Sequence, residues 1–293
     1  MAINRLTLGI TISAIMLLLM SGAALADGKI SLRLQGGWTY ILGGDANHGT
    51  KAFFDYHSTG WDSQIGRYRA VHNGYEFGGD IIFELSPRLG IGIGGGYLEI
   101  SRYSQISFHQ AVPSLGSTFA SARPRLSAIA IRAGVYLTVP WKKKFNFLVN
   151  AGLSYFLRSR YSDESEALYF TGDILAIYIL TTTRAENKKA PIGFQGGISL
   201  EYEMGRNFIP YLEARVRYAK FRGWNGTSVL ESDYEIPLSE QGILYYEVVP
   251  TMTNTPRLLM VQSDPPDGPG GEPRQAVIDF SGISLQFGIR IRL

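Results

Sequence analysis

Apolar and polar residues alternate one by one along much of the chain. Between Ile30 and Leu42 every second residue is apolar or glycine, and most of the residues between them are polar or small. Successive side chains of a β-strand point to opposite faces of a sheet, so a period of two predicts a strand with one apolar face. Eight segments of roughly ten residues show this pattern: 30–42, 75–85, 89–97, 129–139, 145–158, 192–203, 211–218 and 283–293.

The connections between these segments alternate strictly between short and long. Three are short turns, at 86–88, 140–144 and 205–207, and four are long, at 45–74, 104–123, 159–190 and 222–276. A soluble sandwich also alternates in polarity, but short periplasmic turns and long extracellular loops are typical of transmembrane β-barrels. We therefore expect an all-β fold, an antiparallel up-and-down transmembrane barrel of eight strands, with both chain ends on the periplasmic side.

Residues 1–26 are expected to be a cleaved signal peptide. They contain Arg5, an apolar stretch from Leu6 to Met20 and small residues before Asp27. The alternative is a membrane anchor, but about 15 apolar residues are short for a transmembrane helix. Residues 27–293 then form the barrel domain.

The composition excludes several other classes. Mean hydropathy is 0.00, which a polytopic helical membrane protein would exceed. The sequence has no cysteine, so disulfides, thiol catalysis and thiolate metal sites are excluded. A net charge of +3 offers no electrostatic footprint for nucleic acid.

The C-terminal segment Gln286 to Leu293 carries hydrophobic residues at alternate positions up to its end. With the eight strands and the alternating turn lengths, it resembles the small outer-membrane barrels of the OmpA/OmpX type, with OmpW-like barrels as runner-up. The resemblance implies a bacterial outer-membrane location, contact with outer-membrane lipids and recognition of the last strand by the barrel-assembly machinery. It departs from the family in ending on Leu293 rather than on an aromatic residue.

The polar strand faces predict a charged barrel interior. An eight-stranded barrel is just wide enough for its own side chains, so charges there must pair. We expect a plug of ion pairs without a continuous pore, and the alternative is a narrow gated conduit. The expected inward charges are Glu76, Asp80, Glu84, Glu201, Glu203, Glu213, Arg33, Arg132, Arg158, Arg215, Arg217, Arg290 and Arg292.

Glycine and the aromatic residues fit the same barrel. The sequence has 34 glycines, and those on the inward faces, such as Gly92 and Gly94, would leave room for arginine and tyrosine side chains from neighbouring strands. Five outward aromatic residues near strand ends fit the girdles at the two membrane interfaces: Trp38, Tyr40, Tyr97, Tyr155 and Tyr202.

Candidate chemistry is sparse, and we expect no enzyme, no cofactor and no metal site. All four histidines, His48, His57, His72 and His109, fall in expected loops. The pairs His57–Ser58 and Ser107–His109, near Asp55 and Asp62, are no more than chance predicts in serine-rich loops. The glycine run 90–96 lacks the following helix of a dinucleotide site.

The long loops contain apolar runs at 174–183, 243–249 and 258–261, and a Pro/Gly tip at 264–271. Either these runs extend the barrel wall or add a hairpin making ten strands, or they form an apolar surface for a partner, a lipid or a small hydrophobic molecule. Two functions follow. The first is a non-enzymatic structural or surface protein that binds an extracellular partner through loops 159–190 and 222–276. The second is a transporter of small hydrophobic solutes or a narrow channel, and a lipid-modifying barrel enzyme is a weaker third.

Overall fold

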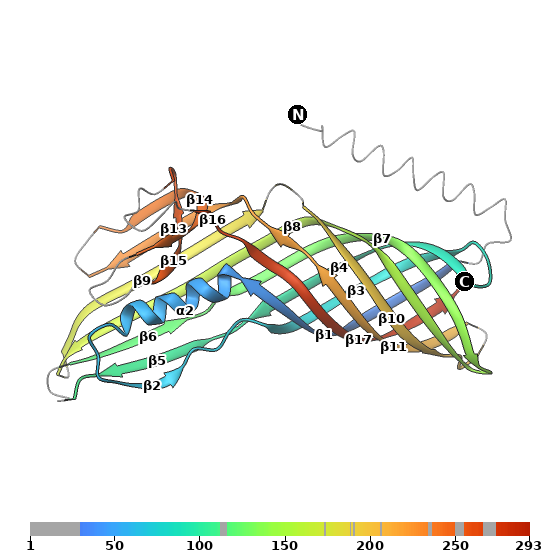
Figure 1. Cartoon of the computed structure of the whole chain (residues 1–293), viewed down its shortest axis with the longest axis horizontal. Helices are drawn as coiled ribbons and strands as arrows, with labels where there is room; N and C mark the ends of the chain where they lie inside the picture. The colour runs from blue at the N-terminus through green and yellow to red at the C-terminus, as the bar shows by residue number, and fades with distance from the viewer. Residues whose placement is uncertain are drawn as a thin grey trace.

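The computed structural model describes residues 30–111, 116–172, 174–187, 189, 191–205, 207–233, 236–249, 255–265 and 274–293. The expected signal peptide at 1–26 and most of the 264–271 tip lie outside these residues. Within them the chain forms one antiparallel sheet system with a single α-helix (Figure 1). That helix is too short and too polar to cross a membrane.

Eight strands pair with one another in a closed ring, which we call the ring. Starting from β1, the order is β3, β4, β7, β8, β10, β11 and β17, and β17 pairs again with β1. Each of the eight alternating segments falls almost entirely within one of these strands. Their bounds are β1 Ile30–Gly44, β3 Asn73–Glu84, β4 Leu89–Ser101, β7 Arg125–Lys142, β8 Phe145–Thr171, β10 Ile192–Tyr202, β11 Phe208–Tyr218 and β17 Ile278–Arg292.

The described residues form 17 strands, so the expected count of eight was wrong. Eight of the additional strands lie in the four long connections, which therefore are not loops, and short β12 (Lys220–Phe221) continues beyond β11 along β17. The other eight are β2 (Ser63–Arg67), β5 (Ser104–His109), β6 (Ser117–Ala122), β9 (Ile174–Asn187), β13 (Trp224–Ser232), β14 (Leu238–Val248), β15 (Arg257–Gln262) and β16 (Arg274–Gln275).

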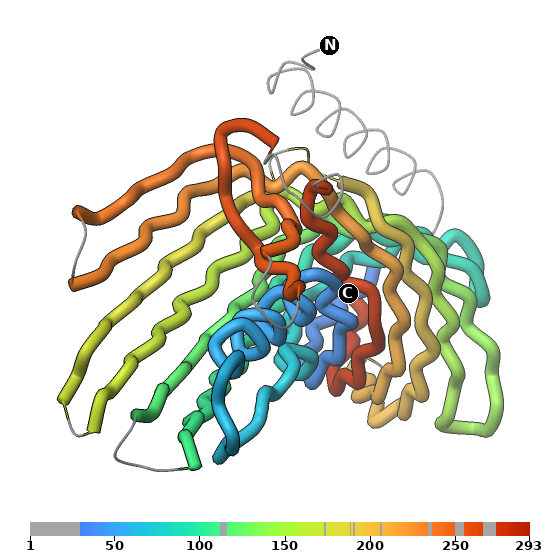
Figure 2. Tube along the Cα trace, turned by 60° about the vertical axis from the view of Figure 1, so that its left-hand side comes forward, coloured from blue at the N-terminus to red at the C-terminus, as the bar shows by residue number. Residues whose placement is uncertain are grey.

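These added strands prolong the sheet beyond the ring. They pair in the order β2, β5, β6, the second half of β8, β9, β13, β14 and β15, with β16 beside β14. We call this part, together with helix α2 (Asp45–His57), the extension. It curves as a broad trough at one end of the molecule (Figure 2), and none of its strands enters the ring, so the ten-strand alternative was also wrong.

Helix α2 lies across the inner side of the extension. The chain enters it from β1 through Gly43 and Gly44, whose positive φ angles of 75° and 60° suit glycine. Asp45 then accepts hydrogen bonds from both terminal nitrogens of Arg274, at 2.6 and 2.7 Å, and from the backbone N–H of Val277. These contacts fasten the helix to β16 and to the residue that precedes β17.

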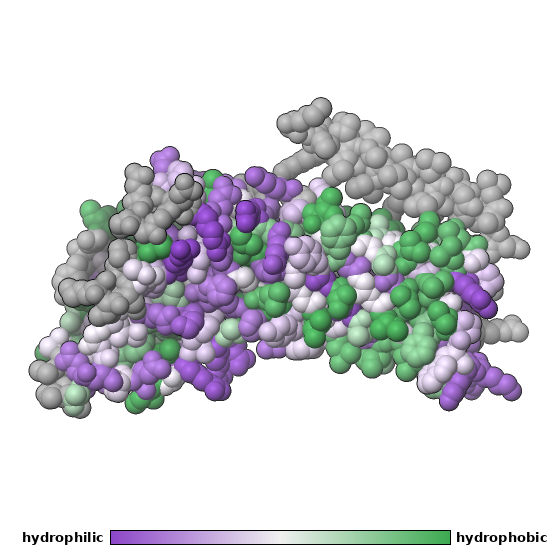
Figure 3. All heavy atoms as spheres, in the orientation of Figure 1, coloured by the Kyte–Doolittle hydropathy of each residue, from purple (hydrophilic) through white to green (hydrophobic). Residues whose placement is uncertain are grey.

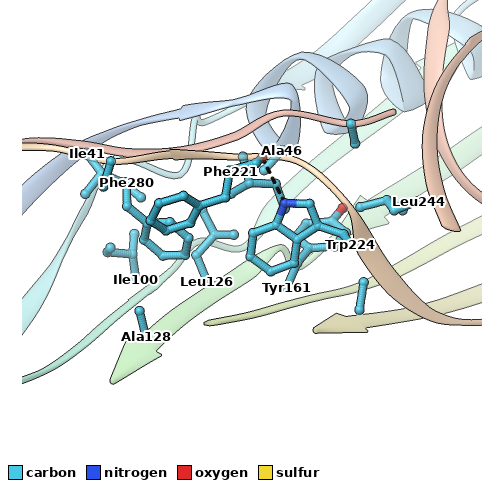
Figure 4. Packing of buried hydrophobic residues seen from close by; sticks show 14 of the residues in the cluster. Ile41, Ala46, Ile100, Leu126, Ala128, Tyr161, Phe221, Trp224, Leu244 and Phe280 are labelled. Atoms are coloured by element: carbon cyan, nitrogen blue, oxygen red, sulfur yellow. Dashed lines mark hydrogen bonds between the residues drawn. The ribbon is translucent and has the colours of Figure 1, made fainter. Parts of the chain in front are cut away.

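An apolar cluster fills the junction between the ring and the extension (Figure 4). The indole of Trp224 stacks near Phe280 and donates a hydrogen bond to the carbonyl oxygen of Phe221 at 3.1 Å. Ile41 and Leu126 belong to the same buried cluster. Because these residues come from five different strands, the cluster ties both parts of the molecule together.

The outer surface of the ring is apolar, and we call it the apolar band. Leu34, Phe77, Phe194, Val216 and Phe287 are each at least half exposed. Figure 3 shows hydrophobic side chains gathered over the ring, and hydrophilic ones over the extension and near the turns at the opposite end. A soluble protein rarely exposes a contiguous apolar surface of this kind, which marks an interaction surface.

Candidate functional site

The ring interior is filled by a network of paired charges. Glu76 lies at its centre and contacts Arg132, Arg215 and Arg217 at 3.3, 3.5 and 2.9 Å. Its carboxylate also accepts a hydrogen bond from the hydroxyl of Ser284 at 2.9 Å. Arg132 also contacts a second carboxylate, that of Asp80. Arginines and carboxylates therefore each have several partners and do not form isolated pairs.

Two further groups complete the network along the ring axis. Arg33 is completely buried, donates to Glu213 at 2.9 Å and lies over the ring of Tyr211, with its guanidinium carbon 3.9 Å from the centroid. Nearer the short turns, Arg290 binds Glu201 at 3.0 Å and Glu84 at 2.5 Å. Arginine suits these positions because its planar fork can hold two carboxylates at once.

Twelve of the thirteen charged residues that the sequence predicted inside the ring lie there. Six carboxylates and six arginines lie inside, so the network is balanced in formal charge. Two cavities between their side chains have volumes of only about 20 and 10 Å³. Each is roughly the space of one water molecule.

Arg158 is the exception, and its expected inward position was wrong. The pairing of β7 with β8 shifts by one residue between Ile129 and Ala130, where Leu157 is extra on β8. A bulge of this kind changes which face the following residues occupy. Arg158 therefore lies on the outer surface, paired with Glu186 at 2.9 Å.

The prediction that inward glycines leave room for neighbouring side chains is confirmed at two positions. A Cβ atom on Gly94 would lie 2.0 Å from a carboxylate oxygen of Asp80, and one on Gly92 would lie 2.6 Å from the ring of Tyr136. Both distances are far below van der Waals contact. Glycine is thus required for the charged and aromatic side chains to cross the narrow interior.

The extension contains a different kind of site, a cavity of about 180 Å³. We call it the extension cavity. Phe53 of α2, Leu230 of β13 and Leu259 of β15 supply apolar wall, and Thr183 of β9 supplies a hydroxyl. Apolar walls with a few polar groups are the usual composition of a small-molecule site.

Asp163 is the charged group of the extension cavity with the most unusual environment. One of its carboxylate oxygens accepts a hydrogen bond from Ser165 at 2.9 Å, and the hydroxyl of Tyr161 also interacts with the carboxylate. Burial raises the pKa of Asp163 to about 6. The cavity wall thus contains one buried carboxyl group among its apolar residues.

The apolar run 174–183 extends the sheet, as the first of its two interpretations predicted. It belongs to β9, which pairs with β8 and β13 and so extends the sheet. Ile174 and Ile177 are exposed on that sheet, whereas Thr181 and Thr183 line the extension cavity. Of the other two apolar runs, 243–249 lies mostly in β14 and 258–261 in β15.

In the described part of the chain, the two Ser–His pairs noted in the sequence are not joined by a hydrogen bond. The hydroxyl of Ser58 donates to the backbone carbonyl of Asp55 at 2.8 Å, away from its neighbour His57. His57 instead contacts the hydroxyl of Tyr169, and burial lowers its pKa to about 4. His109 lies on β5 with Ser107, and the described residues include no group of three or more His, Cys, Asp or Glu able to hold a metal ion.

The expected aromatic girdle is partly visible at the strand ends. Trp38 and Tyr97 are exposed on the outer surface at 44% and 36%. Tyr40 stacks on the imidazole of His72, 4.8 Å between centroids, and Tyr202 lies beside Lys144 near the short turns. Aromatic side chains thus occur toward both ends of the apolar band.

Comparisons with known proteins give distant structural likenesses alone. No family model and no curated protein matches the chain. CarO2 of Acinetobacter baumannii is similar at 11% identity and TM-score 0.38, covering 90% of this chain and 98% of that one. A major outer membrane protein from Thermus thermophilus has 12% identity and TM-score 0.38, covering 92% and 100%. The outer membrane protease OmpT from Escherichia coli has 11% identity and TM-score 0.40, covering 91% and 96%. These likenesses are too distant to place the chain in a family.

Proposed function

We propose that the chain is a non-enzymatic outer-membrane β-barrel whose closed interior anchors a folded extension at the cell surface. The observation that carries this proposal is the inversion of polarity in the ring, with charges inside and a continuous apolar surface outside. Closed barrels are one of only two structures that satisfy all backbone hydrogen bonds in lipid. Alternating short and long connections then direct the extension outward.

The extension is the part that would carry binding. The ring is occupied by its own side chains, and its two small cavities hold too little space for a ligand. The extension has a folded surface, a cavity and exposed apolar residues such as Ile236, which is 91% exposed. These observations therefore support a role at the cell surface better than a role as a channel. They do not distinguish the OmpA/OmpX type from other small barrels. The C-terminal strand, with Phe287 61% exposed, would be the segment read by the assembly machinery.

The absence of cysteine makes the topology directly testable. Ile236→Cys on the extension should react with a membrane-impermeant maleimide in intact Gram-negative cells. Lys143→Cys in a short turn should react only after the outer membrane is permeabilised. Val216→Cys, on the apolar band, should react with a lipid-soluble maleimide and resist the water-soluble one. Labelling of Lys143→Cys in intact cells, or free labelling of Val216→Cys by the water-soluble reagent, would contradict the proposal.

A second candidate function is binding of a small apolar solute in the extension cavity. Its volume of about 180 Å³ exceeds that of engineered cavities that bind benzene, which are about 150 Å³. Toluene is a suitable probe, detected by saturation-transfer NMR on the full chain in detergent. Ser228→Phe should fill the cavity and abolish transfer, whereas Thr227→Phe on the opposite face of β13 should leave it unchanged. Equal transfer in both variants would place toluene elsewhere.

A further inference from the structure

The outer surface of the extension carries a second concave region, with a volume of about 950 Å³, which we call the arginine groove. Four arginines line it: Arg125 of β7, Arg158 and Arg160 of β8, and Arg184 of β9. The alternate residues Leu126, Tyr161 and Ala185 point inward to the apolar cluster, so the groove lies on the opposite, outer face.

The pairing of three strands brings these arginines together. Arg125 and Arg184 both pair with Ser162 of β8, one from each side. Neighbouring strands lie about 4.8 Å apart, which places the Cα atoms of these two arginines about 10 Å apart. Arg160 follows on the same face of β8, two residues from Ser162. An anionic group above Ser162 can therefore be reached by three guanidinium groups.

The acidic residues nearby compensate these charges only in part. Arg158 and Arg160 share one carboxylate, that of Glu186, at 2.9 and 2.6 Å. Arg125 binds Glu99 of the neighbouring strand β4 at 2.7 Å, and about half of its side chain remains exposed. Arg184 is exposed and forms no ion pair with any residue that the structure describes. Glu164 lies two residues beyond Ser162 on the same face of β8. Four arginines therefore stand against three carboxylates, and the groove retains a net positive charge.

The arginine groove lies directly beyond the apolar band. Along β7 the exposed apolar residue Ile129 is followed outward by Ser127 and Arg125, and along β8 Leu157 is followed by Arg158 and Arg160. Tyr97, an aromatic residue at the edge of the band, also lines the groove. In the proposed orientation this is the level at which the headgroups of the outer leaflet begin.

We propose that the arginine groove binds the phosphate-bearing headgroup of an outer-leaflet lipid whose acyl chains lie on the apolar band beneath it. The inference rests on the proposed membrane orientation. Arginine binds phosphate by two parallel charge-assisted hydrogen bonds, and the groove offers several such forks beside an apolar surface. A free phosphate would use the arginines alone, whereas a lipid uses both the arginines and the band.

The test measures binding of lipid A, which carries two phosphates, to the purified full chain in zwitterionic detergent by native mass spectrometry. Replacing Arg125, Arg160 and Arg184 by alanine together should weaken binding at least tenfold. The matched control replaces Lys142, Lys143 and Lys144 by alanine, which removes the same charge at the opposite end of the ring and should leave binding within twofold. Lipid A lacking both phosphates should bind the native chain at least tenfold more weakly.

Three results would overturn the inference: native affinity in the triple-arginine variant, an equal loss in the lysine variant, or complete competition by inorganic phosphate at the lipid's own concentration. Outer-membrane fractionation is measured on the native chain, and maleimide labelling on its Val216→Cys variant prepared in the same way. If both tests agree with insertion and lipid binding is independent of the arginines, the groove assignment fails and the membrane proposal stands. If the native chain does not fractionate with the outer membrane, or the variant labels freely with the water-soluble reagent, the membrane proposal itself is wrong.

Discussion

The ring and the extension use one continuous sheet with opposite polarity. The ring keeps arginines and carboxylates inside and exposes leucine, valine and phenylalanine outside. The extension packs Trp224, Tyr161 and Leu244 inside and exposes charged residues such as Arg160. The first arrangement suits lipid outside, and the second suits water outside. The comparison shows that the change of polarity between the two faces of the sheet occurs within single strands.

Strand β8 shows how the change is made. Before the bulge at Leu157, its odd-numbered residues, such as Val149 and Leu153, face outward. After the bulge, odd-numbered residues such as Tyr161 and Ala167 face inward. One extra residue therefore moves the apolar positions from the outer to the inner face without interrupting the alternation in sequence.

Deletion of Leu157 should have the largest effect because it removes this change of face. Apolar residues of the second half of β8 would be directed to water, and we expect the extension to lose its folded structure while the ring still forms. Limited proteolysis of the chain in detergent measures both parts, through rapid cleavage of the extension and survival of a ring fragment. An extension as protease-resistant as that of the native chain would show that the bulge does not set the inward face.

Glu76→Ala should produce the next largest effect, within the ring. It leaves Arg132, Arg215 and Arg217 without their shared carboxylate, and breaking a buried ion pair costs about 3–5 kcal/mol of unfolding free energy. Tryptophan fluorescence during urea unfolding in detergent measures the loss.

Asp55→Ala is the matched control for that substitution. Its partner Lys51 and Asp55 itself are both exposed, and exposed pairs contribute less than about 1 kcal/mol. A loss in Glu76→Ala no larger than in this control would mean that the interior charges do not stabilise the ring.

Asp163→Asn should give a smaller, pH-dependent effect confined to the extension. Burial raises the pKa of Asp163 to about 6, so its protonated form is favoured in the folded state. The carboxyl group therefore stabilises the folded extension most at pH values below its ordinary pKa, and this stabilisation is lost as the pH rises through 6. One pKa unit corresponds to 1.36 kcal/mol. The unfolding free energy of the native chain should therefore fall by at most about 3 kcal/mol by pH 7.

Hydrogen exchange of β8 and β9 from pH 4 to 7, corrected for the intrinsic exchange rate, measures this change, and Asp163→Asn should remove it. His57 acts in the opposite direction, because burial lowers its pKa to about 4 and its stabilising contribution is lost as pH falls from its ordinary pKa toward that value. The difference between the native chain and the variant isolates Asp163, since both retain His57. Equal pH dependence in the two chains would assign the change to another group.

The sequence predicted the ring well because its signal is local. Each segment alternates for about ten residues, and the short turns fix which segments are neighbours. The interior charges followed from the same alternation, except at Arg158, where the bulge depends on the pairing of β7 with β8 and leaves no interruption in the pattern.

The extension was much harder to predict from sequence. Strands β13 and β14 pair with each other, and β13 pairs with β9, which is distant in sequence, while α2 is stabilised by Arg274, 229 residues from Asp45. The alternation of Trp224, Gly226, Ser228 and Leu230 was the one local signal that could have revealed β13 and its cavity-lining face.

Conductance across a planar lipid bilayer tests most directly the claim that the ring is a closed anchor. The native chain, reconstituted at high salt alongside a Val216→Cys variant whose labelling verifies insertion under the same conditions, should give no stable unitary openings, because six arginines and six carboxylates occupy the interior. Stable openings of uniform size in the native chain would contradict the account and favour the narrow channel.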